Sequence, residues 1–183
     1  MSRLEDSLNS LKQKIENNLD SKRVELICDW LDTWGRYIDQ ESTFDPQKRR
    51  NYKAGDIVSI CLGYNVGSEQ GGNRPAVVLG RGSRSSKSLL VVPLGSLATD
   101  DDETKLRWFE ILLGPIEDFN QETGRSLDTR SKALINQLRP ISKQRIINPT
   151  SDRDNCINIG PDKLKLIEEA VVKSIFTTRR FKS

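Results

Sequence analysis

The stretch Gly67-Ser68-Glu69-Gln70-Gly71-Gly72-Asn73-Arg74-Pro75, followed by the apolar run 76–79, sets the organisation of this chain. Its three glycines lack a Cβ atom, so the backbone can adopt positive φ and approach a ligand closely. Pro75 fixes its own φ and favours an extended conformation at Arg74. We therefore predict a mobile polar loop that ends with an arginine at the mouth of a buried strand. Such an arginine can bind phosphate through its planar fork of donors; the simpler interpretation is a surface hairpin whose arginine caps a strand.

The chain of 183 residues contains no histidine, which restricts the chemistry it can perform. Histidine is the usual acid–base side chain near neutral pH and the commonest ligand of transition metals. Any catalysis must therefore use Arg, Ser or Thr, Asp or Glu, Lys or backbone amides, and we expect neither a metal nor another cofactor. Cys28, Cys61 and Cys156 are scattered and odd in number, which favours a reduced compartment such as the cytoplasm. No segment approaches the ~20 apolar residues of a membrane span.

Charge is distributed unevenly along the sequence. Residues 1–43 hold six basic and nine acidic residues, whereas the remainder holds 23 basic and 17 acidic residues, giving net charges of −3 and +6. A basic body favours polyanions through contacts with phosphate. A net charge of this size is also ordinary for such a domain, so it supports polyanion binding only weakly.

Two amphipathic helices are predicted in residues 1–45, which we interpret as a helical N-terminal extension. Apolar residues recur at helical spacing, first at Leu4, Leu8, Leu11 and Ile15 and then at Val24, Ile27, Leu31, Trp34 and Ile38. Asp20 can cap the second helix. Because apolar faces of this size need a partner, we predict that the extension packs on the main body, on a dimer mate or on another protein, or that it shields a binding groove. The segment around Pro46 is a linker.

From Asp56 the apolar pattern changes to a period of two, which indicates β-strands. Five strands are predicted, at residues 56–62, 75–80, 88–94, 107–113 and 132–138, with a polar excursion over 114–130 that contains turns. A terminal helix begins at Gly160-Pro161-Asp162, with proline in its first turn. Several strands followed by a helix suit a small, strongly bent antiparallel barrel, so the predicted fold class is α+β.

Four blocks in this order resemble the MazF/PemK (Kid) family of toxins, which are small endoribonucleases. They are Gly55-Asp56-Ile57-Val58, the loop 67–75, Val91-Val92-Pro93-Leu94-Gly95-Ser96 and Gln137-Leu138-Arg139-Pro140-Ile141. The resemblance covers roughly residues 50–178, and the loop is its most specific block. It implies that residues 50–183 form a toxin domain with an SH3-like antiparallel β-barrel of the MazF/CcdB type and a C-terminal helix.

The resemblance also implies a function. The chain would be the toxin of a toxin–antitoxin pair, a metal-independent and sequence-selective endoribonuclease that cleaves single-stranded RNA and leaves a 2′,3′-cyclic phosphate. A homodimer would build the RNA groove, a cognate antitoxin would occupy it, and toxin and antitoxin together would bind DNA. Two alternatives stay open: a relative that binds RNA or antitoxin but has lost its chemistry, and a gyrase-poisoning toxin of the CcdB type. The intact loop block argues against the second alternative.

RNA carries its own nucleophile, the 2′-hydroxyl, so the protein must align the phosphodiester, withdraw a proton and stabilise the developing charge. The resemblance assigns the central catalytic role to Arg74, whose guanidinium would bind the non-bridging phosphate oxygens. The family's second catalytic position is a threonine, and this chain has Gly95 there. Either Ser96 supplies the hydroxyl after a local shift, or the chemistry is weakened. Glu69, the only carboxylate in the loop, can accept the 2′-proton or orient Arg74.

Further residues are predicted to contact RNA. Ser68 and Gln70 belong to the loop, and the amide of Gly95 can bind phosphate. Trp108 and Phe109 can stack on bases, although core packing is the simpler assignment for at least one of them. The remaining candidates are polar or basic side chains: Arg81, Arg84, Lys87, Asn136, Gln137 and Arg139.

Overall fold

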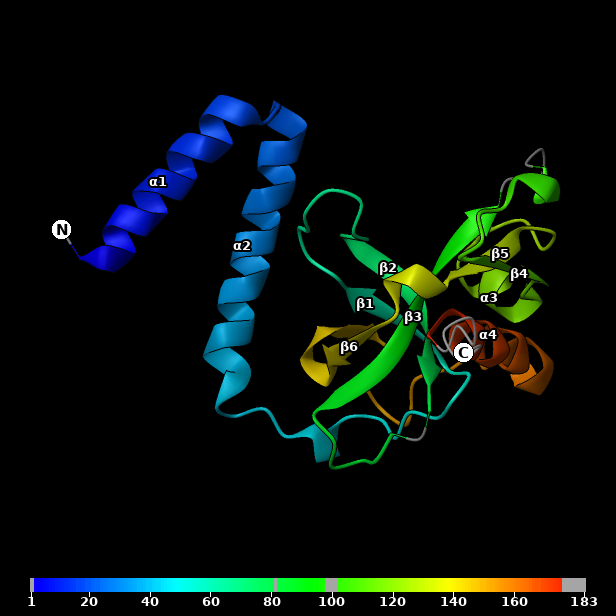
Figure 1. The fold of residues 1–183 in the computed structure, drawn as a ribbon. Helices are drawn as coiled ribbons and strands as arrows, with labels where there is room; N and C mark the ends of the chain where they lie inside the picture. Colours follow the sequence, from blue (N-terminus) through cyan, green and yellow to red (C-terminus); the bar gives the residue numbers. More distant parts are fainter. Residues whose placement is uncertain (1, 81, 98–101, 176–183) are drawn as a thin grey trace, which may run out of the picture. The chain divides into compact units, whose positions relative to one another are not determined.

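A computed structural model describes residues 2–80, 82–97 and 102–175 of the chain, and these divide into two compact units, Met1–Phe44 and Asp45–Ser183 (Figure 1). The first unit contains helices α1 (Arg3–Asn18) and α2 (Ser21–Glu41). The side chain of Asp20 accepts a hydrogen bond from the backbone N of Arg23 at 2.9 Å, so the predicted cap is confirmed. Neither helix contains a buried residue.

Helix α1 also has a start signal that the sequence reading overlooked. Ser2 and Glu5 form a capping box, in which each side chain satisfies a backbone N–H of the other residue. Within the residues that the structure describes, no helix is both long and apolar enough to cross a membrane.

The second unit is built on a seven-stranded sheet in which every pairing is antiparallel. The strands follow the order β4-β5-β3-β2-β1-β7, and β6 pairs with β3. Their bounds are β1 (Ile57–Cys61), β2 (Asn73–Leu79), β3 (Ser88–Leu97), β4 (Glu110–Pro115), β5 (Arg130–Leu134), β6 (Arg139–Ser142) and β7 (Ile146–Asn148). The unit also contains helices α3 (Glu117–Glu122) and α4 (Gly160–Ile175) and the 3₁₀ turns η1 (Pro46–Lys48), η2 (Glu103–Lys105), η3 (Ile135–Gln137) and η4 (Lys143–Arg145).

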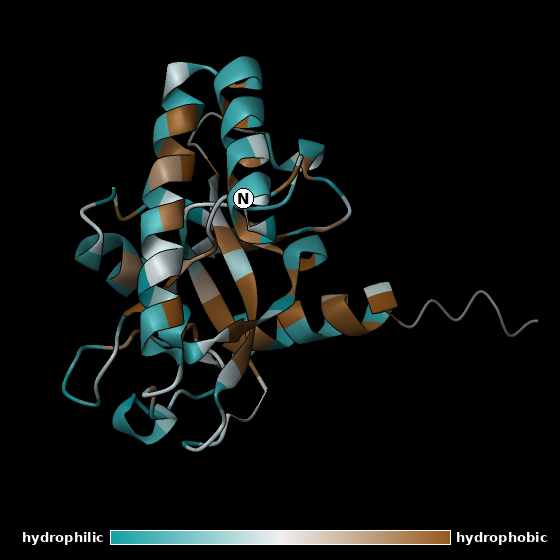
Figure 2. Cartoon of the chain, turned by 90° about the vertical axis from the view of Figure 1, so that its left-hand side faces the viewer, coloured by the Kyte–Doolittle hydropathy of each residue, from teal (hydrophilic) through white to brown (hydrophobic). Residues whose placement is uncertain are grey.

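Residues 76–79 of strand β2 are buried on both faces, which explains why this run is apolar at every position. Val77 and Leu79 pack into a core cluster that includes Ile167 of α4, whereas Ala76 and Val78 pack into a second cluster on the other face. In Figure 2 these central strands are largely brown, the colour of hydrophobic residues. The stretch that carries the arginine loop therefore leads directly into the centre of the fold.

The α+β fold class, with antiparallel strands, N-terminal helices and a C-terminal helix, is confirmed. Among the described strands the pairings form an open path, because none joins β4 to β7. Most strand boundaries differ slightly from the prediction. Strand β2 starts at Asn73, so Arg74 belongs to the strand, and the first residues of the predicted strand 107–113 precede β4. The polar excursion contains the short helix α3, and β7 was not predicted.

The predicted strand 132–138 is wrong in one physical respect, because strand β5 ends at Leu134, the turn η3 follows, and a separate strand, β6, begins at Arg139. Strand β5 pairs with Leu94–Leu97 of β3, whereas β6 pairs with the earlier part of the same strand, Ser88–Val91. The 3₁₀ turn η3 separates them. This break matters for function, because it places the turn beside the arginine loop.

Candidate active site

A cavity of about 490 Å³ lies among the arginine loop, the end of β3, the start of β4 and the β5–η3 segment. Eight of the residues predicted from the sequence line it: Ser68, Gln70, Arg74, Gly95, Ser96, Phe109, Asn136 and Gln137. Three further residues with charged side chains line it: Arg107, Glu110 and Lys132. The four segments are distant in sequence, so only the fold brings these groups together.

The arginine loop folds back on the residues that follow β1. The backbone N of Leu62 donates to the carbonyl of Gly72 at 2.9 Å, and the N of Gly72 donates to the carbonyl of Gly63 at 2.8 Å. Gly67 and Gly72 have φ values of 61° and 70°, which other residues rarely adopt. Gly71 is required for a different reason, since a Cβ atom there would lie 2.8 Å from the carbonyl oxygen of Gly63.

Arg74 is exposed and lies opposite Ile60 in the β1–β2 ladder. Its Nε donates to the carbonyl of Gly71 at 3.2 Å, so the loop backbone orients the guanidinium. No carboxylate in the described part of the chain forms an ion pair with this guanidinium. A positive charge is therefore held at the cavity without a neutralising partner.

The turn η3 is tied to the loop through Gln137. The side-chain oxygen of Gln137 accepts a hydrogen bond from the backbone N of Gln70 at 3.1 Å. Asn136, next to it, is exposed and lines the cavity. This contact couples the position of the loop to the β5–β6 connection, which explains why the two sequence blocks belong to one site.

Gly95 and Ser96 lie near the end of β3, opposite Lys132 and Ser131 of β5. The structure gives no backbone reason for a glycine at position 95. A Cβ atom added there would contact Cε and Cγ of Lys132 at 3.5 and 3.6 Å, which are ordinary van der Waals distances. The missing side chain thus leaves a space that the aliphatic part of Lys132 borders.

Three cations and one carboxylate carry the charge of the cavity. Nζ of Lys132 lies 2.8 Å from Oε1 of Glu110, and the backbone N of Arg107 donates to Oε2 of Glu110 at 2.9 Å. These contacts, first the Arg107 amide and then Lys132, lower the pKa of Glu110 below its usual value. Glu110 therefore stays ionised. Because three cations, Arg74, Arg107 and Lys132, outnumber this one carboxylate, the lining has a net positive charge suited to a phosphate.

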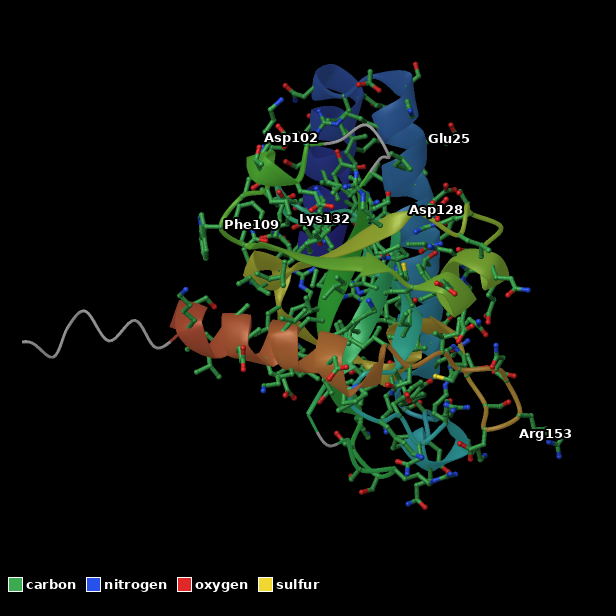
Figure 3. The ribbon with its side chains drawn as sticks, turned by 90° about the vertical axis from the view of Figure 1, so that its right-hand side faces the viewer. Glu25, Asp102, Phe109, Asp128, Lys132 and Arg153 are labelled. Carbon is green, nitrogen blue, oxygen red and sulfur yellow. The ribbon has the colours of Figure 1, made fainter. Side chains whose placement is uncertain are left out.

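Aromatic side chains flank this charged region. Phe109 lines the cavity, and the guanidinium carbon of Arg107 lies 5.8 Å from the centre of its ring. Trp108 is 75% exposed and meets Phe109 edge to face, with ring centres 5.5 Å apart. Phe109 and Lys132 are labelled in Figure 3, on the segment before β4 and on β5. Because its indole is exposed, Trp108 does not pack in the core, and it retains the predicted capacity to stack on a base.

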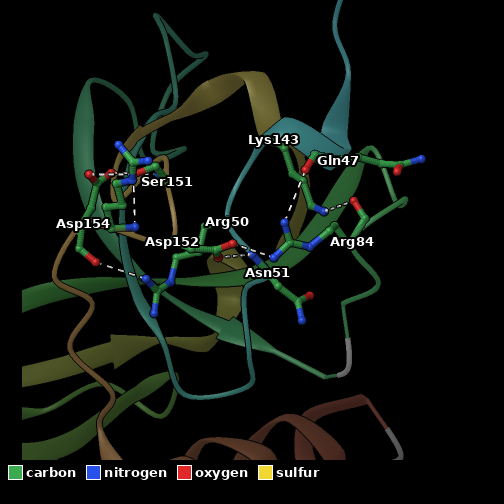
Figure 4. A network of polar contacts seen from close by, with 9 residues as sticks. Gln47, Arg50, Asn51, Arg84, Lys143, Ser151, Asp152 and Asp154 are labelled. Carbon is green, nitrogen blue, oxygen red and sulfur yellow. Dashed lines mark hydrogen bonds and ion pairs between the residues drawn. The ribbon is translucent and has the colours of Figure 1, made fainter.

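Several predicted residues do not line the cavity. Glu69 lies 3.8 Å from Arg139, an ion pair between the loop and the start of β6. Arg84 lies in the segment before β3 and forms an ion pair of 2.6 Å with Asp152 (Figure 4). Lys87 adjoins the start of β3, roughly 25 Å along the strand from Gly95 at ~3.3 Å per residue. Arg81 lies outside the described residues.

The sequence reading overlooked the roles of Lys132, Glu110 and Arg107. Lys132 and Glu110 fall inside predicted strands. In a strand with alternating polar and apolar residues, a charged residue is expected on the face that points to solvent. A lysine directly beside the buried residues Ala133, Leu134 and Ile135 was the available signal. Its meaning depends on the register that places Lys132 opposite Gly95.

Two further observations concern a second hollow and the groups that could hold a metal ion. A smaller hollow of about 240 Å³, bordered by Ile57, Pro75 and Phe119, contains one arginine, Arg125, and one glutamate, Glu122, so its charges balance. Among the described residues, no group of three or more His, Cys, Asp or Glu side chains is placed to hold a metal ion. The larger cavity is thus the better phosphate site.

Residues 53–175 match a family model described as "PemK-like, MazF-like toxin of type II toxin-antitoxin system". Among solved structures, the chain is similar to MazF (Form-I) from Deinococcus radiodurans, with 20% identity, 69% of this chain and 97% of that chain covered, and a TM-score of 0.48. It is also similar to an endoribonuclease in complex with its cognate antitoxin from Mycobacterial species, with 12% identity, coverage of 68% and 94%, and a TM-score of 0.45. No curated protein matches the chain.

Proposed function

The chain belongs to the PemK-like, MazF-like toxins of type II toxin–antitoxin systems, since their family model matches residues 53–175, and on this premise we propose that it is an endoribonuclease acting on single-stranded RNA. The observation that carries the proposal is the cavity itself, whose lining has a net positive charge. Arg74, Ser96 and the loop residues Ser68 and Gln70 all line it. A phosphodiester is the anion that such a lining fits, and RNA carries its own nucleophile, the 2′-hydroxyl.

In the proposed reaction the ribose 2′-oxygen forms a bond to phosphorus while the bond to the 5′-oxygen breaks. The 2′-proton passes to water, the departing 5′-oxygen takes a proton from water, and the products are a 2′,3′-cyclic phosphate and a 5′-hydroxyl. Negative charge builds up on the non-bridging oxygens during this step. We assign its stabilisation to Arg74, whose orientation by the Gly71 carbonyl reduces the reorganisation needed in the transition state.

Other residues receive supporting roles. Ser96 is exposed at the cavity and can donate a hydrogen bond to the phosphate. Asn136 and Gln137 supply amide groups that can contact base edges. Because Glu69 pairs with Arg139 and does not line the cavity, we propose that it organises the rim and does not accept the 2′-proton.

Partners follow from the family. A toxin of a type II system has a protein antitoxin, and we propose that the cognate antitoxin covers this cavity. We further propose that two copies of the chain assemble into a homodimer that builds the RNA groove, that the toxin–antitoxin complex binds DNA, and that the protein acts on cytoplasmic mRNA. Residues 1–45 would be an extension outside the toxin domain 50–183.

The test is incubation of the purified full chain with a long single-stranded transcript in EDTA, followed by mapping of the new RNA ends. Cleavage at a short recurring sequence with cyclic phosphate ends is the expected result. Intact RNA at enzyme concentrations that give saturable binding would overturn the proposal.

A second function is favoured by one specific observation, the absence of a side chain at Gly95 in the cavity. A protein with this lining but without chemistry would be an RNA- or antitoxin-binding module. It would bind the transcript with the salt dependence of phosphate contacts and leave it uncut.

A further inference from the structure

Lys132 and Glu110 form a pair of charged side chains in the cavity to which the family resemblance assigns no role. Its partners are close, at 2.8 Å, and poorly exposed, with 19% of the Lys132 side chain and 13% of the Glu110 side chain accessible. Lys132 stands opposite Gly95, the position at which the resemblance led us to expect a threonine.

Given the proposed endonuclease function, on which this inference rests, we propose that Lys132 is a catalytic residue that replaces the missing side chain at position 95. Its ammonium group would donate to a non-bridging oxygen of the scissile phosphate. Glu110 would be a positioning residue that holds this ammonium in place.

The space at Gly95 is the first argument. The Cγ and Cε atoms of Lys132 lie 3.6 and 3.5 Å from where a Cβ atom at position 95 would be. A threonine would add two more atoms to this Cβ atom. A threonine at position 95 and the lysine at position 132 are thus alternative ways to place a hydrogen-bond donor at this point of two paired strands.

The geometry around Glu110 is the second argument. Each of its oxygens is engaged, Oε1 by Lys132 and Oε2 by the backbone N of Arg107. A carboxylate held in this way by two donors is a poor proton acceptor, so it suits orientation better than general base catalysis. The side chain of Arg107 also lines the cavity, so the Glu110 carboxylate contacts two residues of the site, Arg107 and Lys132.

The charge count is the third argument. Lys132 and Glu110 neutralise each other, but an ammonium has three donors and only one is needed for Oε1 of Glu110. The remaining donors can turn to a phosphate without breaking the pair. Charge that is already oriented before the reaction is the arrangement that stabilises a transition state most effectively.

Lys132→Met is the central variant, and Arg130→Met is its matched control. Arg130 lies two residues earlier on β5 and also pairs with a carboxylate, Glu103 at 2.6 Å, but it does not line the cavity. The substrate is a short RNA around a cut mapped with the wild-type chain. A 2′-O-methyl version of this RNA, which lacks the nucleophile, measures binding and reports that each variant is folded.

We expect Lys132→Met to lower kcat by about 10²-fold, the effect of removing one preorganised donor, with a much smaller change in KM and in binding of the 2′-O-methyl RNA. Lys132→Gln, which keeps a donor for Glu110 but no charge, should show a similar loss, and Lys132→Arg should recover most of it. Glu110→Gln should lower kcat in the wild type but add little in the Lys132→Met background, because it acts through the lysine.

The exchange variant Gly95→Thr/Lys132→Val tests the replacement directly, and we expect it to cleave faster than Lys132→Met. Cleavage by Lys132→Met and Lys132→Gln at the rate of Arg130→Met would overturn the inference while leaving the endonuclease proposal intact. A loss confined to KM would also overturn it, since the lysine would then only bind substrate. Absence of cleavage by the wild-type chain would overturn the proposed function and the inference together.

Discussion

Two groups of cations in the second unit contain the same residue types but have different surroundings. The cavity holds Arg74, Arg107 and Lys132 with a single carboxylate, Glu110. The other group, which we call the polar network, contains Arg50, Arg84, Lys143, Asp152 and Asp154. The formal charges sum to +2 in the cavity and to +1 in the polar network, so the two groups differ mainly in what their cations face.

The polar network satisfies its cations with oxygen atoms of the protein (Figure 4). Lys143 is 1% exposed, and its Nζ donates to the carbonyls of Ser83 and Arg84 at 2.9 and 3.2 Å. Arg84 pairs with Asp152, and Arg50 donates to the carbonyl of Asp154 at 3.1 Å. Burial, with the nearby Arg84 charge, lowers the pKa of Lys143 below its usual value. A cation whose donors end on protein oxygens stabilises a loop, whereas a cation that faces a cavity is available to a ligand.

The largest expected effect concerns Arg74, the cation that distinguishes the cavity. Arg74→Ala should lower the cleavage rate by 10²–10³-fold or more, about the value for one preorganised oxyanion donor. Thermal stability should barely change, because the residue is exposed and makes no ion pair with any residue that the structure describes. Arg153→Ala, an exposed arginine outside the cavity, is the control and should cleave normally. Equal rates for both variants would remove Arg74 from the mechanism.

Lys143→Met should have the opposite effect: it should lower the free energy of unfolding and leave the cleavage rate unchanged. The variant leaves the carbonyls of Ser83 and Arg84 without their buried donor, which costs about 2 kcal/mol. Urea unfolding measures this loss, and cleavage per folded molecule should stay unchanged. A strong fall in kcat with normal stability would show that the two groups of cations are not functionally separate.

Ser96→Ala should have a smaller effect than either. Ser96 is exposed on β3 and can give the phosphate one neutral hydrogen bond, typically ~1 kcal/mol, so the cleavage rate should fall roughly fivefold. Single-turnover cleavage of the mapped substrate measures the change. No change at all would mean that the hydroxyl does not take part and that the charged groups act without it.

The smallest expected effect is a pH dependence within the polar network. Backbone hydrogen bonds from Ser151 and Thr150 lower the pKa of Asp154 from 3.8 to about 2. Because the folded-state pKa is the lower one, the stabilisation is complete well above pH 3.8 and is lost as the pH falls towards 2. Asp154→Asn should therefore be less stable than the wild type at neutral pH, and this difference should shrink in that acidic window. A difference in unfolding free energy that is constant with pH would contradict the assigned role of the carboxylate.

Local patterns carried much of the prediction. Helices α1, α2 and α4 follow from apolar spacing and from start signals such as Asp20 and Gly160-Pro161, which depend on residues only a few positions apart. The arginine loop was recognised because its glycines are needed by its own backbone, at Gly67 and Gly72 through φ and at Gly71 through contact with Gly63. The break of residues 132–138 at η3 was missed, because it depends on how β5 and β6 share one strand, β3.

The sequence by itself therefore determined the fold class, the loop and the arginine that the proposed chemistry requires. The tertiary structure decided which other charged residues share the cavity with Arg74. It placed Lys132 opposite Gly95 and beside Glu110, and it tied Arg84 to Asp152 at a distance of 68 residues in sequence. The physical reason is that a period of two fixes which residues share a face of a strand, whereas strand order and register fix what each residue faces. Electrostatic partners are set by the second of these, and no single strand contains that information.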